Sequence, residues 1–235
     1  FIIDKETKNK IITEDPKSAE LIKPYVTATN IERYNIKNKN DQFFINTYYD
    51  LDISLFPGVF NWLSNFEEQL LKRQDKGIHH YNLRACKYYD KFDTKKIIYI
   101  HTAVNHKFYF DTDGYYINNS CYFISNADKF LSIWLNSKIF KFYKKLNFVA
   151  YGDSHGNGRA KLDYNKMINV PIPNINTNDK KPFEIKADLM LELSNAFQKT
   201  ISIFTTYLQS QFPIEKLSKK LQNWHELEFG DFIKE

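Results

Sequence analysis

The feature that most constrains the fold is the succession of segments between residues 95 and 147. An apolar, β-branched run at 95–104 (KKIIYIHTAV) precedes KFYFD, a DTDG turn and GYYINNSCYFIS, and this order is typical of strand, turn and strand. Apolar residues then align on one helical face: Leu131, Leu135, Ile139, Phe142 and Leu146. We therefore expect a sheet with a helix packed on it.

The flanking segments add further elements of both kinds. Residues 1–14 (FIIDKETKNKIITE) predict a hairpin, and QFFIN at 42–46 predicts another strand. From Pro57 the apolar period becomes helical and continues to Gly77. The sequence thus predicts an α+β fold, with a mixed or antiparallel sheet flanked by helices and a C-terminal helical segment.

A change of character near residue 175 suggests two parts. VPIP and the polar linker NINTNDKK lead to Pro182, after which two helices are expected. The first helix carries one apolar stripe: Leu193, Phe197, Ile201, Phe204 and Leu208. The second is expected after Pro213, with Leu217, Leu221 and Trp224 on one face. We divide the chain into 1–175 and 183–235.

Size and composition favour a folded protein over a disordered or membrane-bound one. The 235 residues are 43% hydrophobic and 26% charged, and no run of 18 apolar residues or signal-peptide pattern occurs. Cys86 and Cys121 lack CxxC spacing, which is typical of two free thiols in a reduced, cytoplasmic setting. Because Phe1 opens directly into a strand-like run, we expect a fragment whose catalytic domain lies upstream.

Positive charge is concentrated in one window. Residues 69–96 hold eight Lys or Arg against three Asp, whereas the whole chain carries only +5. Lys is abundant everywhere, at 29 of the 33 basic residues, so the four arginines are the more informative cations: Arg33, Arg73, Arg84 and Arg159. A guanidinium can hold phosphate and read guanine bidentately.

Motifs for catalysis are weak. GDSHG around Ser154 matches a nucleophile elbow, but a second glycine and polar residues follow instead of a helix. Asp179, Glu184 and Lys186 faintly resemble a nuclease metal site, although they fall near a predicted helix start. DTDG lacks the later ligands of a calcium loop, and no nucleotide-binding motif occurs. We predict no catalytic residue, cofactor or metal in this chain.

The order of several segments carries a resemblance. FIID, DPKSAELIKPYVTATNIERY, FPGVFNWLSNFEEQLLKRQD, HYNLRACKYYDKFDTKKIIY, YFI, LSIWLNSKIFKFY and NVPIP follow one another. Together they resemble the TaqI-like C-terminal target-recognition domain of adenine-specific DNA methyltransferases, especially those fused to nucleases as type IIG restriction-modification enzymes. The match runs over about residues 1–175, and LSKKLQNWHELEFGDFIKE resembles the ends of such enzymes. HHYNLR departs from relatives, which commonly place a tryptophan before this leucine.

The resemblance implies a specificity module that binds double-stranded DNA and catalyses nothing itself. It follows a methyltransferase domain of the same polypeptide, which would use S-adenosylmethionine to methylate a flipped adenine. The catalytic tetrad belongs to that domain, so no catalytic residue is carried over. The implied setting is the bacterial cytoplasm.

Two segments suit DNA contact, since Lys and Arg neutralise phosphates and polar side chains read base edges. The first lies between the end of a helix and the start of a strand, and its candidates are Lys72, Arg73, Lys76, His79, His80, Arg84 and Lys87. The second is the loop at 151–161, with His155, Asn157, Arg159 and Lys161. Simpler interpretations are an ion-pair role for Arg84, packed tyrosines at 81, 88 and 89, and a solvated face for Lys138, Lys141, Lys144 and Lys145.

Two other functions stay open. The apolar stripe from Leu193 to Leu208 suggests a protein-interaction module that docks another subunit through the C-terminal helices. A nuclease remnant around Glu184 is the third hypothesis.

Overall fold

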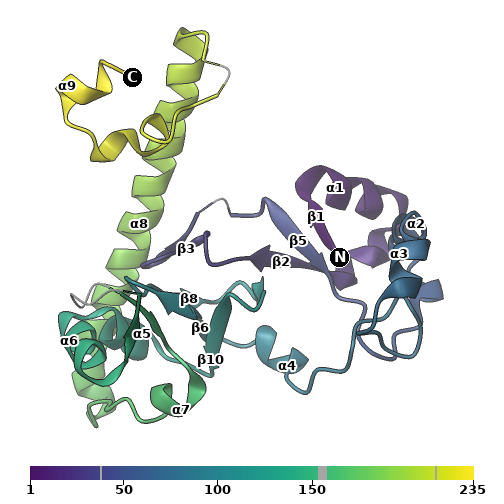
Figure 1. Cartoon of the computed structure of the whole chain (residues 1–235), viewed down its shortest axis with the longest axis horizontal. Coiled ribbons are helices and arrows are strands. Elements are labelled where there is room, and N and C mark those ends of the chain that lie inside the picture. Colours follow the sequence, from purple (N-terminus) through teal and green to yellow (C-terminus); the bar gives the residue numbers. More distant parts are fainter. Residues whose placement is uncertain (38, 153–157, 215) are drawn as a thin grey trace. The chain divides into compact units, whose positions relative to one another are not determined.

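The computed structural model describes residues 1–37, 39–152, 158–214 and 216–235. The chain divides into two compact units, Phe1–Ala187 and Asp188–Glu235, and each is described by itself (Figure 1). The fold class is α+β, as the sequence predicts, with antiparallel and mixed sheets beside helices.

The strands are β1 (Ile2–Asp4), β2 (Ile22–Val26), β3 (Ile31–Glu32), β4 (Asn35–Ile36), β5 (Gln42–Ile45), β6 (Lys96–Ile100), β7 (Thr102–Ala103), β8 (Phe108–Asp111), β9 (Tyr116–Ile117), β10 (Cys121–Ser125), β11 (Ala150–Tyr151) and β12 (Arg159–Lys161). The helices are α1 (Lys5–Glu14), α2 (Pro57–Ser64), α3 (Glu67–Lys72), α4 (Tyr89–Phe92), α5 (Lys129–Asn136), α6 (Lys138–Asn147), α7 (Tyr164–Met167), α8 (Thr177–Gln211) and α9 (Phe229–Phe232). Three 3-10 helices are η1 (Pro16–Leu21), η2 (Ile53–Leu55) and η3 (Leu221–Glu226).

The first sheet has the order β1-β5-β2-β9, with β5 antiparallel to both neighbours and β9 parallel to β2. Its apolar side chains join those of α1, α2 and α3 in one cluster, which we call the first core and which runs in sequence from Ile3 to Tyr81. The hairpin predicted for residues 1–14 is wrong beyond β1. Asp4 accepts a hydrogen bond from the Thr7 amide at 2.8 Å and caps a helix whose Ile11 is buried.

The helix predicted from Pro57 to Gly77 is two shorter helices. Pro57 stands in the first turn of α2, where its missing N–H costs nothing. The backbone leaves the helical region at Phe66 (φ −117°, ψ 15°), and α3 then ends at Lys72, well before Gly77. Because α3 ends at Lys72, residues 73–83 form a loop.

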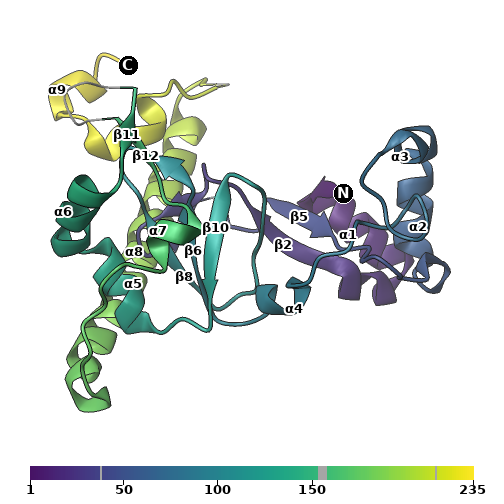
Figure 2. The ribbon, with the colours of Figure 1, turned by 60° about the horizontal axis from the view of Figure 1, so that its bottom comes forward.

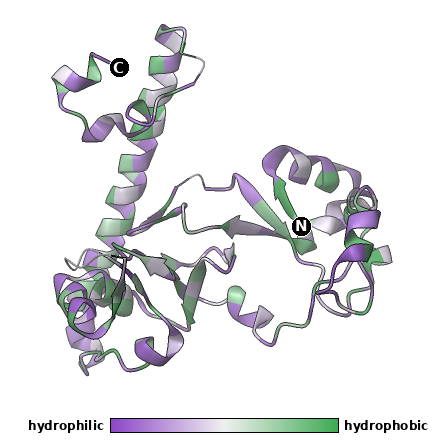
Figure 3. Cartoon of the chain, in the orientation of Figure 1, coloured by the Kyte–Doolittle hydropathy of each residue, from purple (hydrophilic) through white to green (hydrophobic). Residues whose placement is uncertain are grey.

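The second sheet has the order β10-β6-β8 and is antiparallel throughout, which confirms the strands expected between 95 and 125. Ile97 and Phe108 are fully buried in a second cluster, the second core, which runs from Ile97 to Val170 and includes side chains of α5 and α6. Figure 2 shows these helices beside the sheet, with the smaller β11-β12-β7 sheet at one end. Buried apolar side chains lie on strands β6 and β8, and Figure 3 shows the hydropathy along the chain.

The single helix expected to pack on this sheet is divided at Ser137. Ser137 has an extended ψ of 162°, and its side chain caps α6 by accepting from the Phe140 amide at 3.1 Å. The new helix turns Phe140 inward, whereas Ile139, Phe142 and Leu146 are 61–68% exposed. The predicted inward orientation of these three residues is therefore wrong.

Two features involve helix α4, which lies in sequence between the residues of the first core and those of the second. The rings of Tyr25, Phe44, Tyr116 and Phe92 form a continuous stack, with successive centroid distances of 6.2, 5.6 and 4.5 Å. They come from β2, β5, β9 and α4. Separately, the buried Lys96 ammonium pairs with Asp111 and donates to the Phe92 carbonyl. Asp111 in turn accepts from the backbone amides of the following turn.

Helix α8 begins before Pro182, so most of the predicted linker is helical. Its first turns belong to the first unit, where Lys180 pairs with Asp128 at 2.8 Å. In the second unit Phe204 packs on Trp224 at a centroid distance of 4.3 Å. The helix expected after Pro213 is replaced by η3 and α9. Among the described residues, no helix has both the length and the apolarity to cross a bilayer.

Candidate nucleic-acid interface

The first cationic segment begins where α3 ends. Arg73 has an extended ψ of 139°, and the chain then forms a loop that returns to residues 47–51. The Ile78 amide donates to the Tyr49 carbonyl at 3.0 Å, and the Leu83 amide donates to the Thr47 carbonyl at 2.7 Å. We call residues 73–83 the anchored loop.

Two fully buried polar side chains hold the anchored loop in place. The Asn82 amide donates to the carbonyls of Tyr48 and Leu51, both at 3.0 Å, while its oxygen accepts from the His79 amide. Thr47 donates its hydroxyl proton to the Tyr81 carbonyl at 2.7 Å. Buried polar groups with complete hydrogen bonding favour one conformation. The loop is thus a defined platform for the cations that surround it.

Gly77 is required by the close approach of the backbone. A Cβ at this position would lie 2.3 Å from the Tyr49 carbonyl oxygen and 2.7 Å from that of Leu83. Neither atom can move without breaking the anchor, so only glycine fits.

Three of the predicted DNA-contact residues bond within this region. The Arg73 guanidinium lies 4.6 Å from the Phe1 ring centroid and donates to the carbonyls of Asp75 (2.6 Å) and His80 (3.5 Å). Burial lowers the pKa of Arg73, and the smaller effect of Asp75 opposes it. Lys76 donates to the Leu71 carbonyl at 2.8 Å, and His80 lies 3.5 Å from Glu67. These contacts shape the loop, and a role at DNA stays a prediction.

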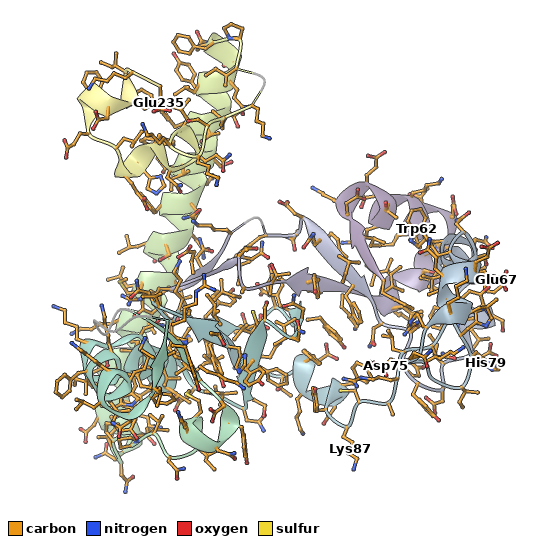
Figure 4. The ribbon with its side chains drawn as sticks, in the orientation of Figure 1. Trp62, Glu67, Asp75, His79, Lys87 and Glu235 are labelled. Atoms are coloured by element: carbon orange, nitrogen blue, oxygen red, sulfur yellow. The ribbon has the colours of Figure 1, made fainter. Side chains whose placement is uncertain are left out.

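The other cations of the first segment are exposed. Lys72, His79 and Lys87 carry exposed side chains, and Figure 4 shows Lys87 extending away from the chain. Arg84 is 3.9 Å from Asp75, with more than 70% of each side chain in solvent. Such an open pair is weak. Their ammonium and guanidinium groups are accessible to an anion.

The neighbouring tyrosines differ in their surroundings. Tyr81 is buried and packs edge-on against Phe60, as predicted for a core residue. Tyr88 is 53% exposed and touches Phe123 at a centroid distance of 6.2 Å. Tyr88 is therefore accessible to a partner, and Tyr81 is not.

The second segment is described only in part. His155 and Asn157, together with Ser154 of the GDSHG motif, lie outside the described residues. Arg159 and Lys161 are on β12, which pairs with β11 and β7. Ala160 between them is buried, so alternation along the strand places the two cations together on the exposed face.

The two segments belong to different cores. The anchored loop contributes Tyr81 to the first core, whereas β12 contributes Ala160 to the second. Each segment therefore presents its cations from its own scaffold.

The alternative chemical sites find little support. Asp179 accepts from Asn176 in the first turn of α8, as a helix-terminal carboxylate does. In the described ranges, no group of three or more His, Cys, Asp or Glu side chains is arranged to hold a metal ion.

Lys144 is one residue whose setting the sequence did not reveal. It was expected on a solvated face with Lys138, Lys141 and Lys145, but it is half-buried against residues 104–106. The sequence does not indicate the burial of Lys144, because the break at Ser137 gives α6 another orientation than a continuous helix would have.

Comparisons with known proteins give a family match at the C-terminal end of the chain and a similarity in fold. A family described as "Domain of unknown function (DUF8810)" matches residues 176–235. The curated proteins give no match. The chain is similar in structure to the type IIL restriction-modification enzyme MmeI, solved in complex with DNA, with a TM-score of 0.51 and 15% identity. The similarity covers 100% of this chain and 29% of that enzyme chain.

Proposed function

We propose that this chain is the DNA target-recognition part of a restriction-modification enzyme, most simply of type IIG. It gives sequence specificity to an adenine-specific methyltransferase domain that lies upstream in the same polypeptide and uses S-adenosylmethionine. The chain itself performs no catalysis. Its proposed setting is the bacterial cytoplasm.

The observation that supports the proposal most strongly is the anchored loop with its exposed cations, on a fold similar along its whole length to MmeI. A base-flipping enzyme needs a surface that holds the duplex while the catalytic domain takes the base. Lys72, Arg84 and Lys87 are exposed, and in this proposal they neutralise phosphates while the exposed His79 contacts a base edge. Arg73 and His80 would hold the loop in shape.

The second segment supplies further cations from the other core. Arg159 and Lys161 share one exposed strand face, which suits contact with successive phosphates or with a groove edge. His155 and Asn157 complete the proposed set as residues with both donors and acceptors.

Binding by the full polypeptide tests this function. Mapping methylated adenines in DNA from cells that express it identifies the target, and fluorescence anisotropy then compares a target duplex with a scrambled one. We expect the target to bind at least about 10³-fold more tightly at physiological salt. Equal affinities for the target and the scrambled duplex would contradict a role in sequence specificity.

The role of the exposed cations that follow the anchored loop is tested by Arg84→Gln with Lys87→Gln. We expect the slope of log K against log salt to become shallower by about 0.9 for each phosphate that is no longer neutralised. Lys10→Gln on α1 removes one charge from an exposed site away from the loop and serves as the control. An unchanged slope in the double variant would exclude these two residues from the interface.

A docking role for α8 is favoured by one observation. Leu189, Leu193 and Phe197 on its stripe are 50–54% exposed, whereas Leu208 further along is buried. Large exposed apolar patches commonly mark interaction surfaces. Sedimentation of the full polypeptide with Leu193→Gln and Phe197→Gln tests this role, with Lys199→Gln as the control. If the wild type is monomeric and binds no partner subunit, the role is rejected.

A further inference from the structure

A further group of cations lies on the second core, on residues outside the two segments assigned above. The tip of the β3–β4 hairpin and helices α5 and α6 enclose a small pocket of about 20 Å³. Three of its lining residues are cations, and three are polar: Arg33, Lys141 and Lys144, with Asn105, His106 and Ser137. We call it the cationic pocket.

Lys144 has one hydrogen-bond donor to spare. Its ammonium donates to the Val104 carbonyl at 2.8 Å and lies 3.1 Å from Nδ1 of His106. An ammonium has three N–H donors, and no partner for the third is found in the described part of the chain. Lys144 is thus held by two contacts with one donor still available at the pocket.

His106 accepts from Lys144 because it is neutral. The ring is 6% exposed, and burial, followed by the charge of Lys144, lowers the pKa of His106 to about 4. Its Nε2 faces the backbone of His101 and Ala160 without reaching good hydrogen-bond geometry. A neutral imidazole can accept at Nδ1, so it fixes the ammonium without repelling it.

The cations of the pocket are not neutralised by an acid in the described part of the chain. Among the described residues, no carboxylate pairs with Arg33, Lys141 or Lys144. Glu32 beside the hairpin tip already pairs with Lys37 (3.2 Å) and Lys107 (2.5 Å). Burial and the charge of Lys141 both lower the pKa of Lys144. A half-buried charge beside like charges is costly, and an anion would offset that cost.

The walls of the pocket are fixed before any ligand arrives. Asn136 accepts from the Phe108 amide at 3.2 Å and donates to the Phe108 carbonyl at 2.7 Å. Ser137 caps α6, whose first turn holds no acidic residue. The positive end of the helix therefore adds to the field of the three cations.

We propose that the cationic pocket binds one phosphate group of the DNA backbone, which adds a contact with the duplex to the one proposed for Arg159 and Lys161. The identity of the ligand as DNA rests on the proposed function. The charge of the pocket supports a phosphate over a base, because three of its lining residues are cations. Such a contact would set register on the duplex without reading its sequence.

The test uses the full polypeptide with Arg33→Gln and Lys141→Gln combined, since both side chains are exposed and their loss leaves the core intact. The matched control combines Lys138→Gln and Lys145→Gln, which removes the same charge from exposed positions of α6 outside the pocket. We expect the pocket variant to lose affinity equally for target and scrambled duplexes, and its salt slope to become shallower by about 0.9 relative to the control.

Neutral methylphosphonates, placed singly along the target duplex, locate the contact. We expect one backbone position at which the replacement weakens wild-type binding about tenfold and leaves the pocket variant unaffected. The pocket proposal is overturned if no such position exists and the salt slope of the pocket variant equals that of the control. The proposed function still stands in that case if the wild type prefers its target duplex. If the wild type binds no DNA, both are overturned. Titration with inorganic phosphate alone tests whether the pocket is a site for the free anion. Tight binding of free phosphate, without an effect of the pocket variant on DNA binding, would also contradict the proposal.

Discussion

The anchored loop and the cationic pocket show two different uses of positive charge. In the loop, Arg73 donates to two carbonyls of its own segment, and Asn82 holds the backbone. In the pocket, Lys144 is held by one carbonyl and one neutral imidazole, and its third N–H donor has no partner among the described residues. The loop lies in the most basic stretch of the sequence, yet Arg73 there donates to carbonyls of its own loop.

The comparison teaches that local charge density and available charge are different quantities. A cation in a basic stretch can serve the fold, while cations distant in sequence can converge on one point. Arg33 and Lys144 are brought together only by the packing of the β3–β4 hairpin beside α6. The difference between the two regions can be tested by four substitutions, in order of expected effect.

The largest effect is expected for Gly77→Ala. The new Cβ would meet the Tyr49 carbonyl oxygen at 2.3 Å, so the loop must detach or the turn at Tyr49 must shift. We expect a loss of about 3 kcal/mol in the free energy of unfolding, measured by urea denaturation. Gly230→Ala, where a Cβ meets nothing within 4 Å, is the matched control. Equal stability of the two variants would show that the loop is not anchored as described.

The next effect concerns pH and the cationic pocket. The folded state holds His106 neutral with a pKa of about 4, whereas an unfolded histidine has one near 6.5. The unfolded state therefore binds more protons in between, and stability is present above pH 6.5 and lost as the pH falls toward 4. We expect His106 to account for about 2 kcal/mol of the loss between pH 7 and 4.5.

Urea denaturation at both pH values checks this. His106→Gln should lose about 2 kcal/mol less than the wild type over that interval, because no imidazole is left to protonate. His79→Gln removes an exposed imidazole and should behave as the wild type. If the free energy of unfolding of the His106 variant fell with pH as much as that of the wild type, His106 would not be a buried neutral ring.

A smaller effect is expected for Arg73→Lys. Lysine keeps the charge but cannot donate to two carbonyls while stacking on Phe1. We expect stability to fall by about 1 kcal/mol, with the salt slope of DNA binding unchanged. Lys72→Arg on the neighbouring helix turn is the control. Weaker DNA binding without loss of stability would instead place Arg73 at the DNA, because lysine keeps the charge but lacks the planar fork of donors.

The smallest effect on stability is expected for Arg84→Ala. Its pair with Asp75 is long and mostly in solvent, so we expect less than about 0.5 kcal/mol. Thermal unfolding by circular dichroism measures this. A larger loss would mean that Arg84 holds the loop as Arg73 does, and would bring the loop closer to a purely structural role.

Much of the fold follows from local sequence pattern. The strands between 95 and 125 are predicted because β-branched and aromatic runs alternate with turn residues, and Pro57 marks the start of α2. The errors occur where one polar side chain decides the outcome. Asp4 caps a helix inside an apparent hairpin, and Ser137 divides an apparently continuous helix. Both residues are common in turns and at helix starts, so pattern alone cannot separate these cases.

The candidate site could be predicted only in part. The basic stretch and the exposed pair Arg159 and Lys161 follow from composition and from the loop at 151–161. The internal bonding of Arg73 and the burial of Lys144 depend on contacts between distant segments. No spacing rule encodes them, because they arise from tertiary packing.

The ring stack from Tyr25 through Phe44 and Tyr116 to Phe92 links strands β2, β5 and β9 to helix α4. Within the proposed function, this packing would keep the anchored loop and the pocket at one spacing. On a duplex, a fixed spacing means a fixed count of base pairs between a reading point and a holding point. New target sequences could then evolve by changing loop residues alone, while the phase of the protein along the double helix is conserved.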